Sequence, residues 1–382
     1  MKYIFRKKIN GVAAACLDAL GYPAAGLFRK GGTTQAIRPS QHILVIRLDH
    51  LGDILPATAI PKVMKENFPA RRVTFLTTAA GASLLENNPF VDEVITYEAP
   101  WFAKQARLAR RGKLKFFELA RVLKEKKIDL GLGLRGDLRE NILMAVAGIR
   151  NRVGYGITGG GFFLTKELAY RRAVHENEHT MDLLRALGVQ IHSLKPQIYF
   201  SETEKTLLEN RLSSWGFREG EKVVGFQVSA GTPAKDWEIK NIRQFLFDFK
   251  NQFPEHRLAF VGSNAERMRQ ISEGGAAAGL DLVGKTTLRE LCFLMKKIQF
   301  FIGPDSGPAH IASAMGVPTL FLYSGTNVFE EWRPLGEHAQ MLRHSVPCSP
   351  CGLRLCPVKG HPCMSLISHR EVMDVLENSL RS

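Results

Sequence analysis

Short apolar runs alternate along the chain with longer segments in which apolar residues recur at helical spacing. In the first half, the apolar runs predict strands at 43–48, 73–78, 91–97 and 130–134. The intervening and following segments predict helices at 54–67, 81–87, 103–126, 138–148 and 177–187. The pattern then restarts, with strands predicted at 222–228, 257–262, 300–303 and 319–323 and helices at 239–252, 264–278, 287–296 and 307–315. Such alternation is typical of an α/β protein with parallel sheets covered by helices on both faces.

The restart divides the chain into two Rossmann-like domains of similar design. Residues 190–202 are the predicted linker, because Pro196 lies in a segment whose periodicity changes. We therefore expect an N-terminal domain at 41–190 and a C-terminal domain at 191–367, preceded by an extension at 1–40. Ser368 and Glu371 form a capping box that predicts a final helix over 368–382.

The most apolar stretch of the chain, residues 11–28, follows a basic start. It carries Asp18 and Pro23 and has no clear small-residue cleavage site, so neither a membrane span nor a signal peptide is favoured. We expect an amphipathic segment that lies in a membrane interface. The alternative is a helix that packs on the first domain.

The formal net charge of +15, from 52 Lys and Arg against 37 Asp and Glu, indicates an anionic partner. Residues 1–40 hold seven basic and one acidic side chain, and residues 101–127 hold ten basic and two acidic ones. Two local basic segments suit an anionic membrane surface better than a protein that coats nucleic acid, although each could be a solvated helix face. The six cysteines are too few and too clustered for a secreted disulfide scaffold, which favours the cytosol.

In the first half, the candidate chemistry lies in the turn DHLGDILP, directly after the first strand. Asp53 begins the next helix at the edge of the sheet where ligands bind in open α/β folds. Its carboxylate could act as a general base, or it could cap the helix, and Asp49 competes for both roles. Gly52 is expected to allow a tight backbone turn.

In the second half, the strand at 300–303 runs into PDSGPAH. Asp305, Ser306 and Gly307 form a small-residue turn whose helix N-terminus can bind phosphate, and His310 lies on the first helical turn. Upstream, the loop VSAGTPAKDW offers Gly231 for close approach and Lys235 for an anionic oxygen. Glu266 could bind sugar hydroxyls, although a glutamate in a first helical turn also interacts with the helix dipole. The alternative for Lys235 is a solvated loop lysine.

Metal chemistry has one candidate, the cysteine run CSPCGLRLCPVKGHPC. Its thiols, from Cys348, Cys351, Cys356 and Cys363, could hold a structural zinc ion, with His344 or His361 replacing one sulfur. Reduced thiols or disulfides are the alternative. No D-x-D triplet occurs, so a divalent ion held by carboxylates is not supported.

Taken together, these motifs resemble glycosyltransferase family 9. The resemblance is carried by IRLDHLGDILPATAIPKVMKENFP, NNPFVDEVI, NRVGY, HTMDLLRALGV, KDW, VGS and GPDSGPAHIASAMGVPTLFLYSGT, and it covers roughly 43–378. It implies a GT-B fold, in which two Rossmann-like domains face a central cleft and close around the substrates. It also implies inversion at the anomeric carbon, no metal requirement, and action at the cytoplasmic face of the inner membrane.

The resemblance assigns roles residue by residue. Asp53 matches the catalytic base, and the acceptor side is assigned Gly52 and Arg135. The donor side is assigned Gly231, Thr232, Lys235, Glu266, Asp305, Ser306, Gly307 and His310. Of these, Lys235 contacts the diphosphate and Glu266 lies near the ribose. The basic N-terminal extension departs from compact family members.

We therefore expect an inverting transferase that moves a sugar, namely a heptose from ADP-heptose, to a lipopolysaccharide core or a related lipid-anchored saccharide. No cofactor is expected for catalysis, and nucleic acid is not an expected partner. A sugar-nucleotide epimerase of the same double-Rossmann design is an alternative, as is a non-catalytic protein that binds membranes or nucleic acid through its basic segments.

Overall fold

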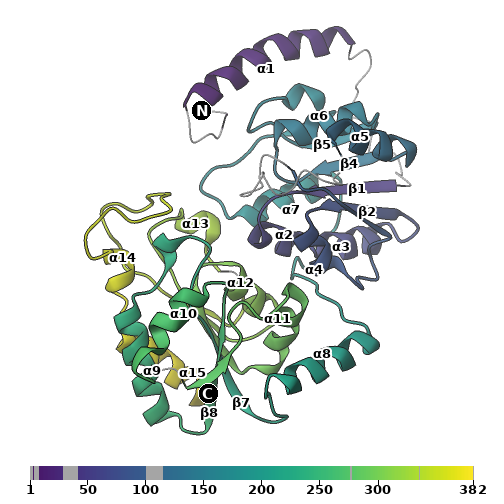
Figure 1. Cartoon of the computed structure of the whole chain (residues 1–382). Helices are drawn as coiled ribbons and strands as arrows, with labels where there is room; N and C mark the ends of the chain where they lie inside the picture. The colour runs from purple at the N-terminus through teal and green to yellow at the C-terminus, as the bar shows by residue number, and fades with distance from the viewer. Residues whose placement is uncertain are drawn as a thin grey trace. The chain divides into compact units, whose positions relative to one another are not determined.

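The computed structural model describes residues 3, 8–28, 42–99, 115–275, 278–334 and 336–381. The chain forms two compact units, Met1–Gln197 and Ile198–Ser382. Their boundary lies inside the predicted linker, a few residues after the predicted division at 190. Each unit contains one six-stranded parallel sheet, which confirms the predicted α/β class (Figure 1). The predicted helix at 103–126 is described only in its last part, because residues 100–114 lie outside the described chain.

The sheet of the first unit has the strand order β3-β2-β1-β4-β5-β6. Its strands are β1 (His42–Arg47), β2 (Arg72–Thr77), β3 (Glu93–Thr96), β4 (Leu130–Gly133), β5 (Asn151–Tyr155) and β6 (Lys166–Leu168). In the register, Ile43 lies opposite Val73 on one side and Leu130 on the other. Every residue of β1 is buried, as expected of a central parallel strand with both faces covered.

Helices cover both faces of this sheet, and alternate residues of β1 separate the two layers. Ile43 and Val45 pack with Met64 and Leu183, whereas Leu44 and Ile46 pack with Leu119 and Met144 on the other face. The helices are α2 (Leu51–Ala57), α3 (Ile60–Asn67), α4 (Ala79–Leu85), α5 (Phe116–Glu125), α6 (Leu138–Val146) and α7 (Glu176–Ala186), with a short 3₁₀ turn η1 (Gly161–Phe163). The single helix predicted at 54–67 is therefore two helices.

Helix α1 (Lys8–Phe28) belongs to the first unit. It packs beside η1, with Ala14 and Asp18 buried at the contact. This contact agrees with the alternative of a helix that packs on the first domain, and the expected position in a membrane interface stays a prediction. Among the described helices, none is long and apolar enough to cross a membrane.

The second unit repeats the design with the strand order β12-β11-β10-β7-β8-β9. Its strands are β7 (Lys222–Gln227), β8 (His256–Val261), β9 (Gly279–Asp281), β10 (Phe300–Pro304), β11 (Thr319–Leu322) and β12 (Ala339–Leu342). Its helices are α8 (Glu202–Ser214), α9 (Ile239–Gln252), α10 (Ala265–Ser272), α11 (Leu288–Leu294), α12 (Gly307–Ala314), α13 (Phe329–Trp332), α14 (Pro362–Ser365) and α15 (His369–Arg381), and its 3₁₀ turns are η2 (Pro233–Lys235), η3 (Glu273–Gly275) and η4 (Met295–Lys297).

The C-terminal helix α15 is part of the second unit's core. Val372 and Leu376 are fully buried in the apolar cluster that also contains Phe245 and Phe260. The predicted capping box is present, since the Ser368 amide donates to the Glu371 carboxylate and the Glu371 amide donates to Ser368 Oγ. The helix predicted over 368–382 is thus confirmed, although it is not a separate domain.

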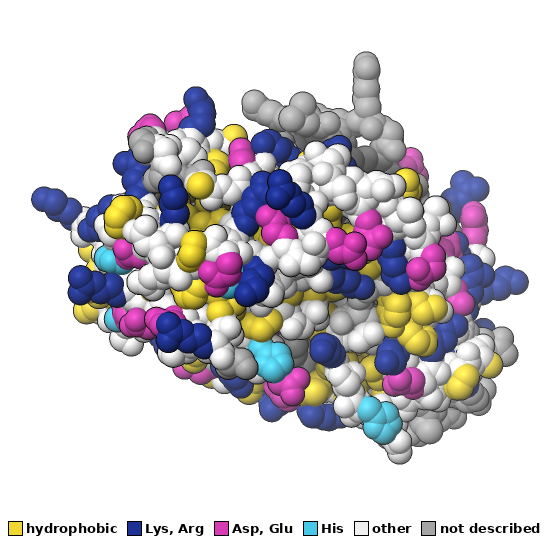
Figure 2. Space-filling model, turned by 90° about the horizontal axis from the view of Figure 1, so that it is seen from below, with side chains coloured by type: hydrophobic (Ala, Val, Ile, Leu, Met, Phe, Trp, Pro, Cys, Tyr) yellow, Lys and Arg dark blue, Asp and Glu magenta, His cyan; other side chains and the backbone are white. Residues whose placement is uncertain are grey.

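Basic and acidic side chains are interspersed on the face of the molecule that Figure 2 shows. Within the described chain, several ion pairs join residues three or four positions apart, such as Arg185 with Asp182 at 3.2 Å. Exposed pairs of this kind contribute little stability, about 0 to 1 kcal/mol each. Such pairing shows that these basic side chains have acidic neighbours.

Candidate active site

The first group of candidate residues lies where β1 ends. The chain leaves the strand at Arg47, passes Asp49 and enters α2, in which Asp53 is the third residue. The Asp53 amide donates to the carbonyl of His50 at 2.9 Å, and His50 occupies the N-cap position. The role of helix cap that we considered for Asp53 is therefore wrong. Its carboxylate is directed to Arg47 instead.

The buried guanidinium of Arg47 organises this group. Its Nε donates to Asp49 at 2.9 Å, and its Nη2 lies 3.3 Å from Asp53 Oδ1 and 3.3 Å from Glu176 Oε1. Charge-assisted contacts of a planar guanidinium fix the carboxylates in orientation as well as in position. The predicted residue Asp53 is thereby held at the carboxyl edge of the sheet.

Burial changes the proton affinity of Asp53. Loss of hydration, together with the nearby negative charge of Asp49, raises the pKa of Asp53 to about 7, although Arg47 opposes the shift. A carboxylate with a pKa near the working pH is suited to accept a proton from a hydroxyl group. The chemistry that the site offers here is general-base catalysis.

The two residues assigned to the acceptor lie in the same region. Arg135, in the loop after β4, donates to Asp49 Oδ2 at 2.7 Å and is about one-third exposed. Gly52 has no left-handed backbone, and a Cβ placed on it would meet nothing within 4 Å. The tight turn that we expected at Gly52 is therefore wrong. Its missing side chain leaves open space one residue before Asp53.

Sequence reasoning missed two residues at the start of α7. The ring of His179 bonds Glu176 through Nδ1 at 3.1 Å and the carbonyl of Arg171 through Nε2 at 2.8 Å. Burial opposes the charged form of His179, but these two acceptors raise its pKa. The signal was present, since Glu176 and His179 stand three residues apart in ENEHT and share one helix face.

A further buried carboxyl, Glu140 on α6, was also missed. Within the described chain neither of its oxygens has a hydrogen-bond partner. Burial, followed by the charges of Asp137 and Asp49, raises the pKa of Glu140 well above its ordinary value. The neutral acid is therefore favoured at this position, which leaves the positive charge of Arg47 available to Asp49, Asp53 and Glu176.

The second group of candidate residues surrounds Asp305, directly after β10. Lys235 Nζ donates to Asp305 Oδ2 at 2.7 Å, His310 Nε2 lies 2.9 Å from Oδ1, and Asn327 Nδ2 donates to Oδ2 at 2.9 Å. Burial alone would raise the pKa of Asp305, but the hydrogen bond from His310 and the charge of Lys235 lower it to about 2. The structure therefore brings three predicted donor residues, Lys235, Asp305 and His310, into one cluster.

Ser306 and Gly307 complete the turn into α12. The Ser306 hydroxyl is hydrogen-bonded to the side chain of Gln227, at the end of β7. Because the hydroxyl is held by Gln227, it does not cap α12. Pro308 has no N–H group, so Gly307 and Ala309 supply the amides of the first turn of α12. Amides at a helix N-terminus can bind phosphate oxygens.

The loop that carries Gly231 and Thr232 is held in place by polar contacts. The Ala230 amide donates to Asp236 at 2.6 Å, and Arg267 on α10 donates to the carbonyl of Val228 at 2.7 Å. Glu266, the neighbour of Arg267, is exposed and pairs with Arg269. Glu266 is therefore not joined to the Lys235 cluster, and its predicted contact with a ribose stays a prediction.

The cysteine-rich loop 348–363 is hydrogen-bonded to the loop that carries Gly231 and Thr232. The carbonyl of Arg354 accepts a hydrogen bond from the Ala234 amide, and His361 Nε2 donates to the Ala234 carbonyl; both distances are 3.0 Å. Both backbone polar groups of the residue before Lys235 are thus satisfied by the cysteine-rich loop. The amides of Cys351 and Gly352 bond Gly325 and Thr326, just before Asn327.

The four thiols of this loop are not gathered as metal ligands in this structure, so the predicted zinc site is not confirmed. The cysteines Cys348, Cys351, Cys356 and Cys363 are all unpaired. Cys363 is buried, and its pKa is raised first by burial and further by the other three thiols. Across the residues that the structure describes, no three His, Cys, Asp or Glu side chains gather as metal ligands would.

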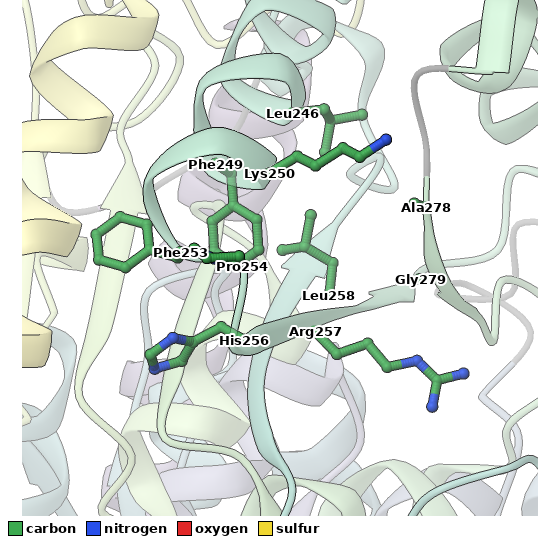
Figure 3. A pocket seen from close by; sticks show the side chains of 10 residues that line it. All are labelled: Leu246, Phe249, Lys250, Phe253, Pro254, His256, Arg257, Leu258, Ala278 and Gly279. Atoms are coloured by element: carbon green, nitrogen blue, oxygen red, sulfur yellow. The ribbon is translucent and has the colours of Figure 1, made fainter.

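One hollow in the second unit lies away from these residues (Figure 3). It has a volume of about 250 Å³ and is lined mainly by apolar side chains of α9 and the start of β8, among them Phe249, Pro254 and Leu258. This is the amino end of the strand, whereas Lys235 and Asp305 follow carboxyl ends. The hollow is not part of the candidate site.

The chain is similar to a known family and to several characterised proteins. The profile of glycosyltransferase family 9 (heptosyltransferase) matches residues 116–361, which is more than half of the chain. Lipooligosaccharide heptosyltransferase 2 of Campylobacter jejuni is 23% identical over 343 residues, covering 87% of this chain and 96% of that protein.

Two solved structures share the fold. A family 9 glycosyltransferase from Veillonella parvula matches with a TM-score of 0.76 and 22% identity, covering 90% of this chain and 98% of the other. ADP-heptose LPS heptosyltransferase II of E. coli matches with a TM-score of 0.70 and 21% identity, covering 89% and 98%. These likenesses confirm the predicted GT-B fold class. The family match, which extends over part of the first unit and most of the second, shows that the chain belongs to glycosyltransferase family 9.

Proposed function

We propose that this glycosyltransferase moves a heptose from ADP-heptose to a lipopolysaccharide core or a related lipid-anchored saccharide, with inversion at the anomeric carbon. The observation that carries the proposal is Asp53, a buried carboxylate with a pKa near 7 at the carboxyl edge of a parallel sheet. The heptosyl donor and the saccharide acceptor are inferred from the names of the relatives in C. jejuni and E. coli.

In this proposal Asp53 accepts the proton of the acceptor hydroxyl. The hydroxyl oxygen forms the new bond to the anomeric carbon, and the bond between that carbon and the diphosphate oxygen breaks, with its electron pair leaving on ADP. A single displacement of this kind inverts the configuration. Arg47 holds the Asp53 carboxylate in place and stabilises its charged form.

The second unit would bind the donor. In this proposal Lys235 and the amides of Gly307 and Ala309 stabilise the departing diphosphate, and His310, which contacts the same Asp305, supports the proposal. Asp305 would act by orienting Lys235 and His310. Because these groups supply the positive charge, the proposal requires no metal ion. Gly231, Thr232 and Glu266 are assigned to the donor on the family resemblance.

Acceptor binding is proposed for Arg135 and the open space beside Gly52. A guanidinium that is one-third exposed can donate to sugar hydroxyls or to a phosphate while it remains bonded to Asp49. A lipid-anchored acceptor would place the enzyme at the inner face of the inner membrane.

A thermal-shift series with nucleotide sugars tests the donor assignment. ADP-heptose at about 100 times its Kd should stabilise the protein by about 2.7 kcal/mol, whereas UDP- and GDP-sugars at the same concentration should stabilise it much less. Stabilisation by a UDP- or GDP-sugar alone would contradict the assigned donor.

Structural zinc stays a prediction from the cysteine spacing. Elemental analysis of protein purified without chelator should find about one zinc per chain, and Cys348→Ser combined with Cys351→Ser should remove it. Protein that is free of metal, with all four thiols reacting in the folded state, would contradict the zinc site without affecting the proposed transferase.

A further inference from the structure

In helix α1 the charged residue is buried and apolar residues are exposed, which is the reverse of an ordinary surface helix. Between Gly11 and Ala25 its one charged side chain is Asp18, and this residue is 3% exposed. The exposed positions of the same stretch carry Ala, Val, Leu, Cys and Pro. A surface helix in water normally turns its apolar stripe to the protein and its charged residues to the solvent.

Specific polar contacts fix the inner face of α1 to the first unit. Asp18 Oδ1 accepts a hydrogen bond from the Gly160 amide at 2.7 Å, and its Oδ2 accepts one from the Tyr3 hydroxyl at 2.9 Å. One turn later, the Tyr22 hydroxyl donates to Glu167. A Cβ on Gly21 would overlap the ring of Phe162, so the helix approaches η1 closely. These contacts decide which side of α1 faces outward.

The outward side is apolar. Leu20 is 77% exposed, Val12 is 64% exposed and Leu17 is 38% exposed. One face of the helix carries the exposed positions 12, 13, 16, 17 and 20. The opposite face carries the buried residues Ala14 and Asp18. The helix therefore presents a continuous apolar strip that no described residue covers.

Basic residues flank the strip in the sequence. Lys2, Arg6, Lys7 and Lys8 precede it, and Arg29, Lys30 and Arg38 follow it, with no acidic residue in residues 1–40 other than the buried Asp18. An apolar helical face with cationic flanks matches the interface of an anionic bilayer, where acyl chains meet negative headgroups.

We propose that the outer face of α1 is a membrane-binding surface that lies in the interface of a bilayer rich in anionic phospholipids, without crossing it. This inference rests on the proposed function in one respect, namely that the acceptor is attached to a lipid. A second copy of the chain is a poorer occupant, because pairing two such helices would bring two sets of basic flanks together. The charge of the flanks thus favours lipid.

The test is sedimentation of the full chain with vesicles of phosphatidylcholine alone or mixed with phosphatidylglycerol. The wild-type protein should bind the mixed vesicles and bind less as salt increases. Leu20→Glu and Val12→Glu should each lower the partition coefficient by about tenfold, because a charge then enters the apolar strip. Leu207→Glu is the matched control, since Leu207 on α8 is also exposed, at 65%.

Circular dichroism and the unfolding midpoint should be the same for Leu20→Glu and the wild type, because Leu20 faces outward. Equal binding of all variants to the mixed vesicles would overturn the proposal. A concentration-dependent dimer that Leu20→Glu dissociates, without vesicle binding, would also overturn it and assign the strip to a second copy. Vesicle binding needs neither donor nor acceptor, so its failure is distinct from a failure of the proposed transferase activity.

Discussion

At the scale of single residues, the site depends on carboxylates whose charge state is set by their surroundings. Asp53 and Asp305 are both buried next to a cation, yet their pKa values move in opposite directions. Asp305 has three hydrogen-bond donors on its oxygens, whereas Asp53 has Arg47 at 3.3 Å and Asp49 close by. Asp305 is therefore suited to carry a permanent negative charge, and Asp53 is suited to proton transfer.

The raised pKa of Asp53 predicts a pH dependence. The carboxylate is the active form of a general base, so kcat/KM should rise through about pH 7 and fall about tenfold per pH unit below it. Initial rates between pH 5 and 9 measure this limb. His179 also has a raised pKa, so His179→Gln is the control, and it should retain the limb. A rate that is constant down to pH 5 would rule out Asp53 as the base.

Lys235 carries the second prediction at this scale. Lys235→Ala should raise the Kd for ADP by about 10- to 150-fold, the value of one hydrogen bond to a charged group. The loss of one of the donors to buried Asp305 should also cost about 1 to 3 kcal/mol of unfolding free energy. Titration calorimetry measures the affinity, with Lys240→Ala as an exposed control. Unchanged affinity for ADP would show that the diphosphate binds elsewhere.

At the scale of elements, the strand-to-helix turns decide where side chains are placed. Gly52 in α2 provides a direct test, because a methyl group there meets no atom and strains no backbone angle. Gly52→Ala should therefore stabilise the fold by about 0.5 to 1 kcal/mol in urea unfolding. If the acceptor passes this position, the same variant should raise the acceptor KM.

Gly148→Ala is the matched control for that experiment. Its Cβ would also meet no atom, but the residue has a φ of +72°, so alanine should destabilise the fold. A loss of stability in both variants would mean that α2 is strained at Gly52. An unchanged acceptor KM in Gly52→Ala would remove Gly52 from the acceptor site.

The hydrogen bonds between the cysteine-rich loop and η2 give another prediction at this scale. His361→Ala removes the donor to the Ala234 carbonyl and should raise the donor KM about 2- to 10-fold, with little change in kcat. His361→Gln keeps an N–H donor and should recover part of the affinity. His344→Ala, whose partner is Glu371, is the control. Equal effects of His361→Ala and His361→Gln would contradict the role of this hydrogen bond.

The elements also show how far sequence reasoning reaches. Buried central strands such as β1 and β7 are predicted within one or two residues, because both faces are apolar. The internal strand β5, the edge strands β6, β9 and β12 and the exposed helix α8 are missed. They are short or polar, so little of their sequence carries a burial pattern. The helix at 239–252 is predicted with its bounds, because its apolar face is strongly periodic.

The candidate site was predictable where a residue follows a strand. Asp53, Asp305 and His310 all stand in such turns, and the structure places each at the carboxyl end of its sheet. Asn327 and Arg267 were missed because they act through contacts with residues far away in the sequence, as Glu176 does in its contact with Arg47. Glu140 was missed because burial is what distinguishes it, and neither of its oxygens has a hydrogen-bond partner in the described chain. Such partners become visible only when the fold brings them together.

At the scale of the whole molecule, two units of the same design carry different chemistry. The first unit holds the proposed base, Asp53, and the two positions proposed for the acceptor, Gly52 and Arg135. The second unit holds Lys235 and the helix N-terminus that are proposed to bind the diphosphate. The family match extends over part of the first unit and most of the second. We propose that the whole chain transfers a sugar and that Asp53 is required for the transfer.

The most direct measurement is mass spectrometry of a heptose-deficient lipopolysaccharide acceptor after incubation with ADP-heptose and the enzyme. The wild-type protein should add one heptose, and Asp53→Asn should lower the rate about 100-fold or more while it binds ADP as the wild type does. A wild-type rate in Asp53→Asn, or an acceptor mass that stays constant with the wild-type enzyme, would contradict the account.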